Sequence, residues 1–205
     1  MNEPSTSKPA RSRLTSLDAL RGFAMFWIIG AREIANGLID LGIPGAGALA
    51  NQLTHSEWNG FTFYDLIFPI FVFVVGVSVV FGIRRRQERG EDRGAIFRQV
   101  IKRTVLLFVL GLFYNGGVSQ SPLMENLRVM GVLQRIALVY FFASILVLTT
   151  SVRAQALSAA GLLAGYWLVM RFVPVPGFGA GVWTPEGNLV RYIDRHLLPG
   201  EPYWG

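Results

Sequence analysis

The chain has 205 residues, of which 52% are hydrophobic, 13% aromatic and only 16% charged, and its mean hydropathy is +0.42. An ordinary soluble domain carries about a quarter charged residues, so this composition excludes a typical soluble enzyme, a disordered chain and a fibrous protein, and it predicts an integral membrane protein. The absence of cysteine excludes a disulfide scaffold, a zinc–thiolate site and a cysteine nucleophile.

The N-terminal residues are polar, and the first apolar segment follows them. We predict a disordered cytoplasmic tail over residues 1–12 and a first membrane span over residues 17–41. Arg32 and Glu33 interrupt this segment, which argues against a cleaved signal peptide. Asp18 and Arg21 lie three residues apart and share a helical face. They are interpreted either as a self-neutralising pair at the membrane surface or as the wall of a binding site.

Residues 61–83 form the clearest predicted span, because Asp65 is their one charged residue. As a helix they would extend about 34 Å, enough to cross a bilayer core of about 30 Å. His55 precedes this span, and in one continuous helix it would lie about 15 Å from Asp65 along the axis. Contact between the two requires a break near Asn59-Gly60, a plausible breaking pair. Asp65 would then orient the imidazole for acid–base chemistry; otherwise His55 is a hydrogen-bonded loop residue.

The positive charge is concentrated between residues 84 and 103, where eight basic and three acidic residues supply +5 of the net charge of +6. A basic region between two apolar segments is typical of a cytoplasmic loop. Anionic lipid is a compatible partner. A nucleic-acid surface is not expected, because aromatic side chains do not alternate with the basic ones.

Three further spans are predicted at residues 100–114, 129–150 and 156–173. The fold class is therefore an all-α, polytopic membrane helix bundle with about five transmembrane helices. The distribution of Lys and Arg places the N-terminal tail, the 84–103 region and Arg153 in the cytoplasm. The loops that contain His55, Pro122 and Pro185 then lie on the extracytoplasmic side of the plasma (inner) membrane.

Arg128 and Arg135 lie seven residues apart on one helical face, with Gln134 beside the second. They are interpreted either as anchors at the lipid headgroups or as ligands of a phosphate or carboxylate, with Asp65 as another partner for one of them. The aromatic residues near Phe71 and Phe141 are expected to face lipid or to pack. No metal site is expected, because the two histidines lie far apart and no acidic cluster joins them.

Four stretches, taken in order, resemble one known family: RLTSLDALRGFAM (13–25), HSEWNGFTFYDLIFPIFVFVVGVS (55–78), RVMGVLQRIALVYF (128–141) and PEGNLVRYIDRHLLPG (185–200). The chain is similar over residues 13–200 to bacterial relatives of heparan-α-glucosaminide N-acetyltransferase, polytopic proteins often described as domains of unknown function. The resemblance implies transfer of an acetyl group from acetyl-CoA across the membrane to the amine of a glucosamine-type sugar. Bacteria do not in general have heparan sulfate, so for a bacterial member the acceptor is expected to be another amino sugar, of envelope or chitin origin.

The resemblance also implies roles for residues at matching positions. His55 is expected to be catalytic and Asp65 to support it, with His55 acting either as nucleophile or as general base. The substrate- or cofactor-binding candidates are Asp18, Arg21, Trp58, Asn59, Arg128, Gln134 and Arg135.

Family members have about twice as many spans, so residues 13–205 are expected to form the N-terminal half of such a transferase domain. It would work with a missing C-terminal half or as a homo-oligomer. Two other functions stay open at this point. The chain could belong to an amino-sugar transporter, since intramembrane charges also suit a permeation path, or it could be a truncated, non-catalytic membrane protein.

Overall fold

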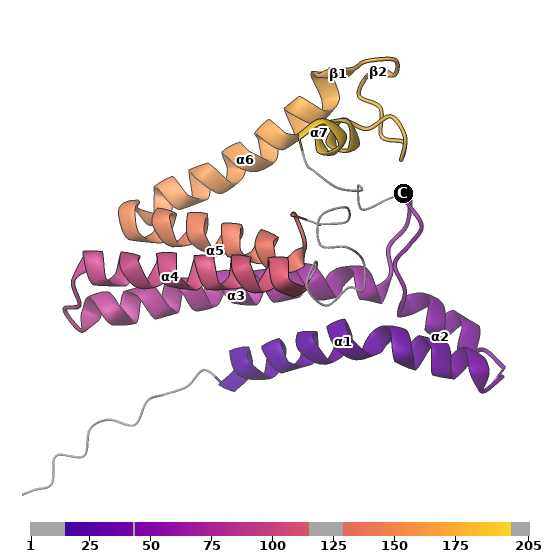
Figure 1. Ribbon diagram of the computed structural model, residues 1–205, viewed down its shortest axis with the longest axis horizontal. Helices are drawn as coiled ribbons and strands as arrows, with labels where there is room; N and C mark the ends of the chain where they lie inside the picture. Colours follow the sequence, from indigo (N-terminus) through magenta and orange to yellow (C-terminus); the bar gives the residue numbers. More distant parts are fainter. Residues whose placement is uncertain (1–14, 43, 115–128, 198–205) are drawn as a thin grey trace, which may run out of the picture. The chain divides into compact units, whose positions relative to one another are not determined.

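The computed structural model describes residues 15–42, 44–114 and 129–197 of the chain. The regular secondary structure of the described part is helical apart from one short hairpin, which confirms the all-α class (Figure 1). Its elements in chain order are α1 (Thr15–Asp40), α2 (Ala46–Gln52), α3 (Phe63–Glu88), α4 (Arg93–Leu112), α5 (Val132–Thr149), α6 (Val152–Phe172), β1 (Pro174–Val175), β2 (Gly179–Ala180) and α7 (Leu189–Leu197).

All five predicted spans coincide with helices, namely α1, α3, α4, α5 and α6. Two of them, α3 and α5, are long and apolar enough to cross a membrane by length and composition. The other three spans remain predictions. The short helices α2 and α7 and the β1–β2 hairpin fall in predicted loops. Three predicted features lie outside the described residues: the tail at residues 1–12, the loop around Pro122, and the candidate site residue Arg128.

The chain divides into two compact units, an N-terminal unit (Met1–Val74) and a C-terminal unit (Val75–Gly205), with the boundary inside α3. In the N-terminal unit α1 packs against α2. The small side chains of Ala31, Ala35 and Ala50 are buried there together with Leu53. Alanine at such a contact lets two helix backbones approach closely.

In the C-terminal unit one apolar cluster joins the end of α3, the start of α4 and the end of α5. It consists of Val79, Ile83, Ile96 and Leu148. Arg86 Nε donates to Glu91 Oε2 at 2.7 Å across the turn between α3 and α4. Asp92 caps α4 by accepting a hydrogen bond from the backbone N–H of Ala95. The α3–α4 turn and the end of α5 therefore lie at the same end of this unit.

Two positions in these helices are unusual. Pro69 lies inside α3 and has no backbone N–H, so it cannot donate the helical hydrogen bond to the carbonyl of Asp65 four residues earlier. Gly111 lies on α4 where that helix packs against α5. A Cβ atom at Gly111 would come within 2.6 Å of Gln134 Oε1 and 2.9 Å of Leu133 Cβ.

We expect Gly111→Ala to destabilise the C-terminal unit by about 1–3 kcal/mol, because the added methyl group overlaps the Cβ of Leu133 and cannot be relieved by side-chain rotation alone. Thermal unfolding in detergent, followed by far-UV circular dichroism, measures this.

The matched control for Gly111 is Gly161→Ala in α6, where a Cβ would meet nothing within 4 Å. Alanine there should leave the midpoint of thermal unfolding unchanged or raise it slightly, since glycine inside a helix is less favourable than alanine by about 0.5–1 kcal/mol. Equal midpoints for the two variants would show that α4 and α5 do not pack closely at Gly111.

Candidate functional site

Asp65 lies in the first turn of α3, where backbone N–H groups are left without helical partners. Its Oδ2 accepts a hydrogen bond from the backbone N–H of Thr62 at 2.9 Å and lies 3.0 Å from the Thr62 hydroxyl. Thr62 directly precedes the helix, so this is one half of a capping box. A carboxylate is also favoured at this position by the positive end of the helix dipole.

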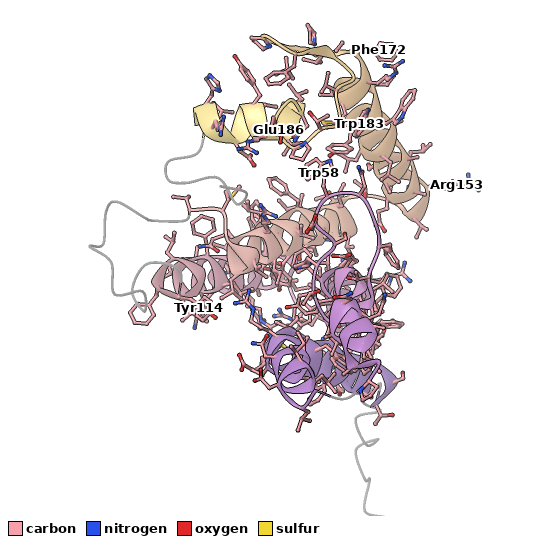
Figure 2. The ribbon with its side chains drawn as sticks, turned by 90° about the vertical axis from the view of Figure 1, so that its right-hand side faces the viewer. Trp58, Tyr114, Arg153, Phe172, Trp183 and Glu186 are labelled. Atoms are coloured by element: carbon pink, nitrogen blue, oxygen red, sulfur yellow. The ribbon has the colours of Figure 1, made fainter. Side chains whose placement is uncertain are left out.

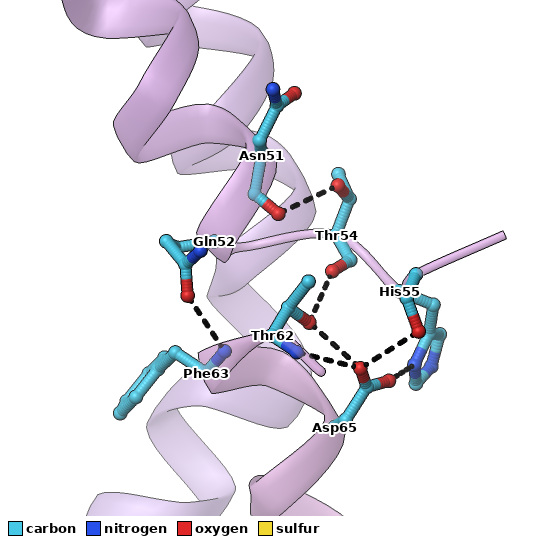
Figure 3. Close-up of polar contacts among 8 residues, drawn as sticks. Asn51, Gln52, Thr54, His55, Thr62, Phe63 and Asp65 are labelled. Carbon is cyan, nitrogen blue, oxygen red and sulfur yellow. Dashed lines mark hydrogen bonds and ion pairs between the residues drawn. The ribbon is translucent and has the colours of Figure 1, made fainter. Parts of the chain in front are cut away.

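His55 contacts the other oxygen of the same carboxylate (Figure 3). The distance between His55 Nδ1 and Asp65 Oδ1 is 2.6 Å, and Ser56 Oγ donates to Asp65 Oδ2 at 3.2 Å. The His55 side chain is 50% exposed and that of Asp65 is 23% exposed. The carboxylate is therefore enclosed by its own loop, whereas the imidazole remains accessible.

The contact depends on a break in the helix between His55 and Asp65. Residues 53–62 are not helical, and the chain turns back so that Thr62 Oγ1 lies 2.7 Å from the carbonyl oxygen of Thr54 (Figure 3). Gln52 Oε1 accepts a hydrogen bond from the Phe63 N–H at 3.1 Å, which ties the end of α2 to the start of α3. The break thus includes Asn59-Gly60, the pair that the sequence indicated as a plausible breaking point if His55 and Asp65 were to meet.

Gly60 is required by the shape of this loop. Its φ of +145° is a conformation that other residues rarely adopt, and a Cβ there would lie 3.2 Å from Ser56 Cβ. The loop therefore closes on itself at Gly60, which keeps His55 and Ser56 next to Asp65.

The geometry fixes which ring nitrogen of His55 carries the proton. An ionised carboxylate only accepts hydrogen bonds, so Nδ1 is the protonated nitrogen and donates to Asp65. In the neutral ring Nε2 then carries the lone pair. The His55 ring also contacts Tyr64, with ring centroids 4.7 Å apart and an interplanar angle of 58°. An imidazole oriented in this way can act as a general base or as a nucleophile through Nε2.

The other predicted site residues fall in three places. Trp58 and Asn59 are exposed members of the loop that carries His55. Asp18 and Arg21 form an exposed ion pair on α1, with Arg21 Nη1 3.6 Å from Asp18 Oδ1. All four belong to the N-terminal unit.

Gln134 and Arg135 belong to the C-terminal unit, on the first turn of α5. Gln134 is fully buried and meets α4 at Gly111, whereas Arg135 is exposed. The two neighbours thus point in different directions. Within the described ranges no group of three or more His, Cys, Asp or Glu residues could hold a metal ion.

Sequence reasoning missed three residues that shape the site: Ser56, Thr62 and Tyr64. A signal for Thr62 was present, since Thr62 and Asp65 have the spacing of a capping box directly before an apolar run. Ser56 and Tyr64 have no such pattern, because their contacts follow from how the loop closes.

Comparison with known proteins gives a consistent match. The family model described as "Heparan-alpha-glucosaminide N-acetyltransferase, catalytic" matches residues 13–187. The chain is 26% identical to the heparan-alpha-glucosaminide N-acetyltransferase of Mus musculus, over 96% of this chain and 33% of the mouse protein. It is 28% identical to the Homo sapiens protein of the same name, over 91% of this chain and 32% of that protein. An uncharacterised 39.9 kDa protein of Bacillus acidopullulyticus is 29% identical over 50% of the chain. The chain thus spans about a third of the length of the mouse and human relatives.

We expect Asp65→Asn to change the tautomer of His55, because an amide can donate to Nδ1 where a carboxylate can only accept. Nitrogen-15 NMR of ¹⁵N-histidine-labelled protein, at a pH where the rings are neutral, distinguishes the two tautomers. The wild-type ring should be protonated on Nδ1, and the variant should show an increased population protonated on Nε2.

His196 provides an internal reference for that measurement. Its Nδ1 lies 2.7 Å from the carbonyl oxygen of Tyr192, so it too should be protonated on Nδ1, in both proteins. A wild-type His55 protonated on Nε2, or a His55 signal that Asp65→Asn leaves unchanged, would contradict the hydrogen bond described above.

Proposed function

Because the chain belongs to the heparan-alpha-glucosaminide N-acetyltransferase catalytic family, we propose that it carries the His55-based centre of a membrane acetyltransferase. The reaction is transfer of an acetyl group from acetyl-CoA to the amine of a glucosamine-type sugar on the extracytoplasmic side. The observation that carries the proposal is the 2.6 Å contact between His55 Nδ1 and Asp65, which directs the lone pair of the imidazole to Nε2.

Two routes use this lone pair. In the first, Nε2 attacks the thioester carbonyl, the coenzyme leaves as a thiolate, and the resulting acetyl-imidazole is attacked by the sugar amine, which restores the ring. In the second, Nε2 removes a proton from the amine while the amine attacks the thioester carbonyl; the C–S bond breaks, and the coenzyme leaves as a thiolate that takes the proton from the ring. In both routes Asp65 stabilises the positive charge that the ring acquires.

A labelling experiment separates the two routes. Purified protein is mixed with [¹⁴C]acetyl-CoA in the absence of a sugar and quenched under conditions that preserve acyl-imidazoles. Label retained on the peptide containing His55 identifies the nucleophilic route. Release of coenzyme only when glucosamine is present identifies the general-base route.

In this proposal the chain crosses the membrane five times, through α1, α3, α4, α5 and α6. Two of these helices, α3 and α5, are the long apolar helices described above. The main support for this placement is the surface of α6, a helix of about 31 Å that leaves large apolar side chains exposed along its length. Those most exposed are Leu157 (74%), Leu162 (71%), Leu163 (74%) and Phe172 (64%). Figure 2 shows Arg153 and Phe172 near the two ends of this helix. Exposed apolar surface on this scale is covered by lipid or protein rather than by water.

The orientation follows from α3 and the charges at its ends. The helix begins next to the His55 loop, and its last turns carry Arg84, Arg85 and Arg86. The Val79–Ile83–Ile96–Leu148 cluster places the end of α5 beside these arginines. We assign this basic end and the N-terminus to the cytoplasm, and the His55 loop to the extracytoplasmic side of the plasma (inner) membrane.

The remaining candidates, apart from Gln134, are proposed to bind substrates. Trp58 and Asn59 extend from the same loop as His55 and are assigned to the sugar. The charged side chains of Asp18, Arg21, Arg128 and Arg135 are assigned to acetyl-CoA or to the sugar, without a metal ion. Gln134 is buried at the contact between α4 and α5, so it is assigned a positioning role for the turn that carries Arg135. Residues 13–205 form the acetyltransferase-like domain in this proposal.

We expect His55→Ala to lower the rate of acetyl transfer by about 10²–10⁴-fold, the usual contribution of a general base, or to abolish it if His55 is the nucleophile. The assay incubates membranes that contain the chain with labelled acetyl-CoA and glucosamine and measures N-acetylated sugar.

The other histidine supplies the control, since His196 has no part in the proposed chemistry. His196→Ala should retain the wild-type rate at equal membrane content. A His55→Ala protein that inserts normally and acetylates at the wild-type rate would refute the proposal. Uptake of unmodified sugar into vesicles, without acetylated product, would identify an amino-sugar transporter instead.

A further inference from the structure

The segment after α6 is folded into a small, ordered module that the proposed chemistry does not use. This C-terminal module comprises residues 173–197, that is, the β1–β2 hairpin, the loop after it and α7. Asn188 caps α7: its Oδ1 accepts from the Arg191 N–H at 2.9 Å, and its Nδ2 donates to the Thr184 and Pro185 carbonyls at 3.0 and 3.1 Å. Asn188 is buried, so the start of α7 is fixed to the loop before it.

The module is also fixed to the end of α6. Met170 of α6, Val175 of β1 and Leu189 of α7 are buried against one another, with Tyr192 packed on them. Gly187 fits closely against the hairpin, since a Cβ there would lie 2.6 Å from Phe178 Cδ1 and 2.8 Å from Val182 Cγ1. The direction of α7 is therefore set by the end of α6.

One side of α7 is apolar, and its side chains are exposed in the part of the chain that the structure describes. Leu189 points into the module, and the three next residues of the same stripe, Val190, Ile193 and Leu197, are 39%, 40% and 74% exposed. At about 100° per residue these side chains fall within about one third of the helix circumference. Asp194 and Arg195 lie on the remaining surface, so α7 has one apolar and one charged face.

Further apolar side chains surround this stripe in the same module. Phe178 at the hairpin and Trp183 in the following loop are 53% and 49% exposed. Figure 2 shows Trp183 and Glu186 on the loop that leads to α7. The exposed apolar surface of α6 continues to Phe172 and Val173, where the module begins. Aromatic residues that follow a membrane-spanning helix are typical of the boundary between lipid and water.

We propose that α7 lies in the plane of the membrane surface, with Val190, Ile193 and Leu197 against the acyl chains and Arg195 toward water. The occupant of the apolar stripe is thus the lipid bilayer. The inference rests on the proposed membrane placement of α6, because the end of α6 determines where the module lies. Helices with one apolar and one charged face bind in this way at the boundary between headgroups and acyl chains.

Site-directed spin labelling tests the proposal directly, because the chain has no cysteine and each introduced cysteine is the only label site. Leu197→Cys and Arg195→Cys form a matched pair, since both positions are exposed and lie about 200° apart around α7. The full chain is reconstituted in phosphatidylethanolamine–phosphatidylglycerol vesicles. Electron paramagnetic resonance then compares collisions of each label with oxygen, which concentrates in lipid, and with a water-soluble nickel chelate.

We expect oxygen accessibility to exceed nickel accessibility at residue 197 and the order to be reversed at residue 195. Ile193→Cys should behave like Leu197→Cys, which keeps the test valid if one variant folds poorly. Nickel-accessible labels on both faces, or an apolar-face label shielded from both reagents by protein, would overturn the inference. Leu163→Cys on α6 separates the two proposals: a lipid signal at 163 with water at 197 rejects only the position of α7, whereas water at 163 rejects the membrane placement itself.

Discussion

The carboxylate of Asp65 connects the local fold of the α2–α3 loop with the orientation of the imidazole. Its two oxygens have different partners: Oδ2 is held by Thr62 and Ser56, and Oδ1 is left for His55. A charged group at the entrance of an apolar helix is costly unless hydrogen-bond donors surround it. The loop supplies those donors only when it closes at Gly60, so closure of the loop and orientation of His55 occur together.

The Thr62 hydroxyl shows how tightly this arrangement is constrained. It lies within hydrogen-bonding distance of both the Thr54 carbonyl and the Asp65 carboxylate, but it has one proton to donate. The shorter contact, 2.7 Å, is to Thr54. The backbone N–H of Thr62 therefore donates the hydrogen bond to Asp65, whereas the Thr62 hydroxyl donates mainly to the Thr54 carbonyl and so joins the two ends of the loop. Because the main donor to Asp65 is the backbone N–H of Thr62, the position of the carboxylate depends on the path of the backbone more than on the Thr62 side chain.

The sequence predicted the long helices well, because an apolar run of sufficient length specifies a helix almost regardless of its surroundings. The contact between His55 and Asp65 was predicted only conditionally, since periodicity cannot show whether Asn59-Gly60 breaks the helix. Ser56 and Tyr64 were missed because their roles arise from loop closure. The small C-terminal module was missed for a similar reason: its two-residue strands and nine-residue helix α7 depend on tertiary contacts to Met170 and on the cap at Asn188. Gln134 and Arg135 are neighbours in the sequence, but Gln134 points to the interface between α4 and α5 and Arg135 points to the surface. A motif match does not distinguish these two directions.

Pro69 makes the first turns of α3 easier to bend than the rest of the helix. The turn that carries Asp65 lacks the hydrogen bond that an ordinary residue at position 69 would donate to the Asp65 carbonyl, and the proline ring crowds that carbonyl. Bending therefore costs less between the first turn of α3 and the rest of the helix than elsewhere along it. A change of direction at the first turn of α3, which holds the His55 loop, therefore costs less free energy than one in a later turn. The candidate centre is thus joined to the rest of α3 through the turn of that helix that bends most easily.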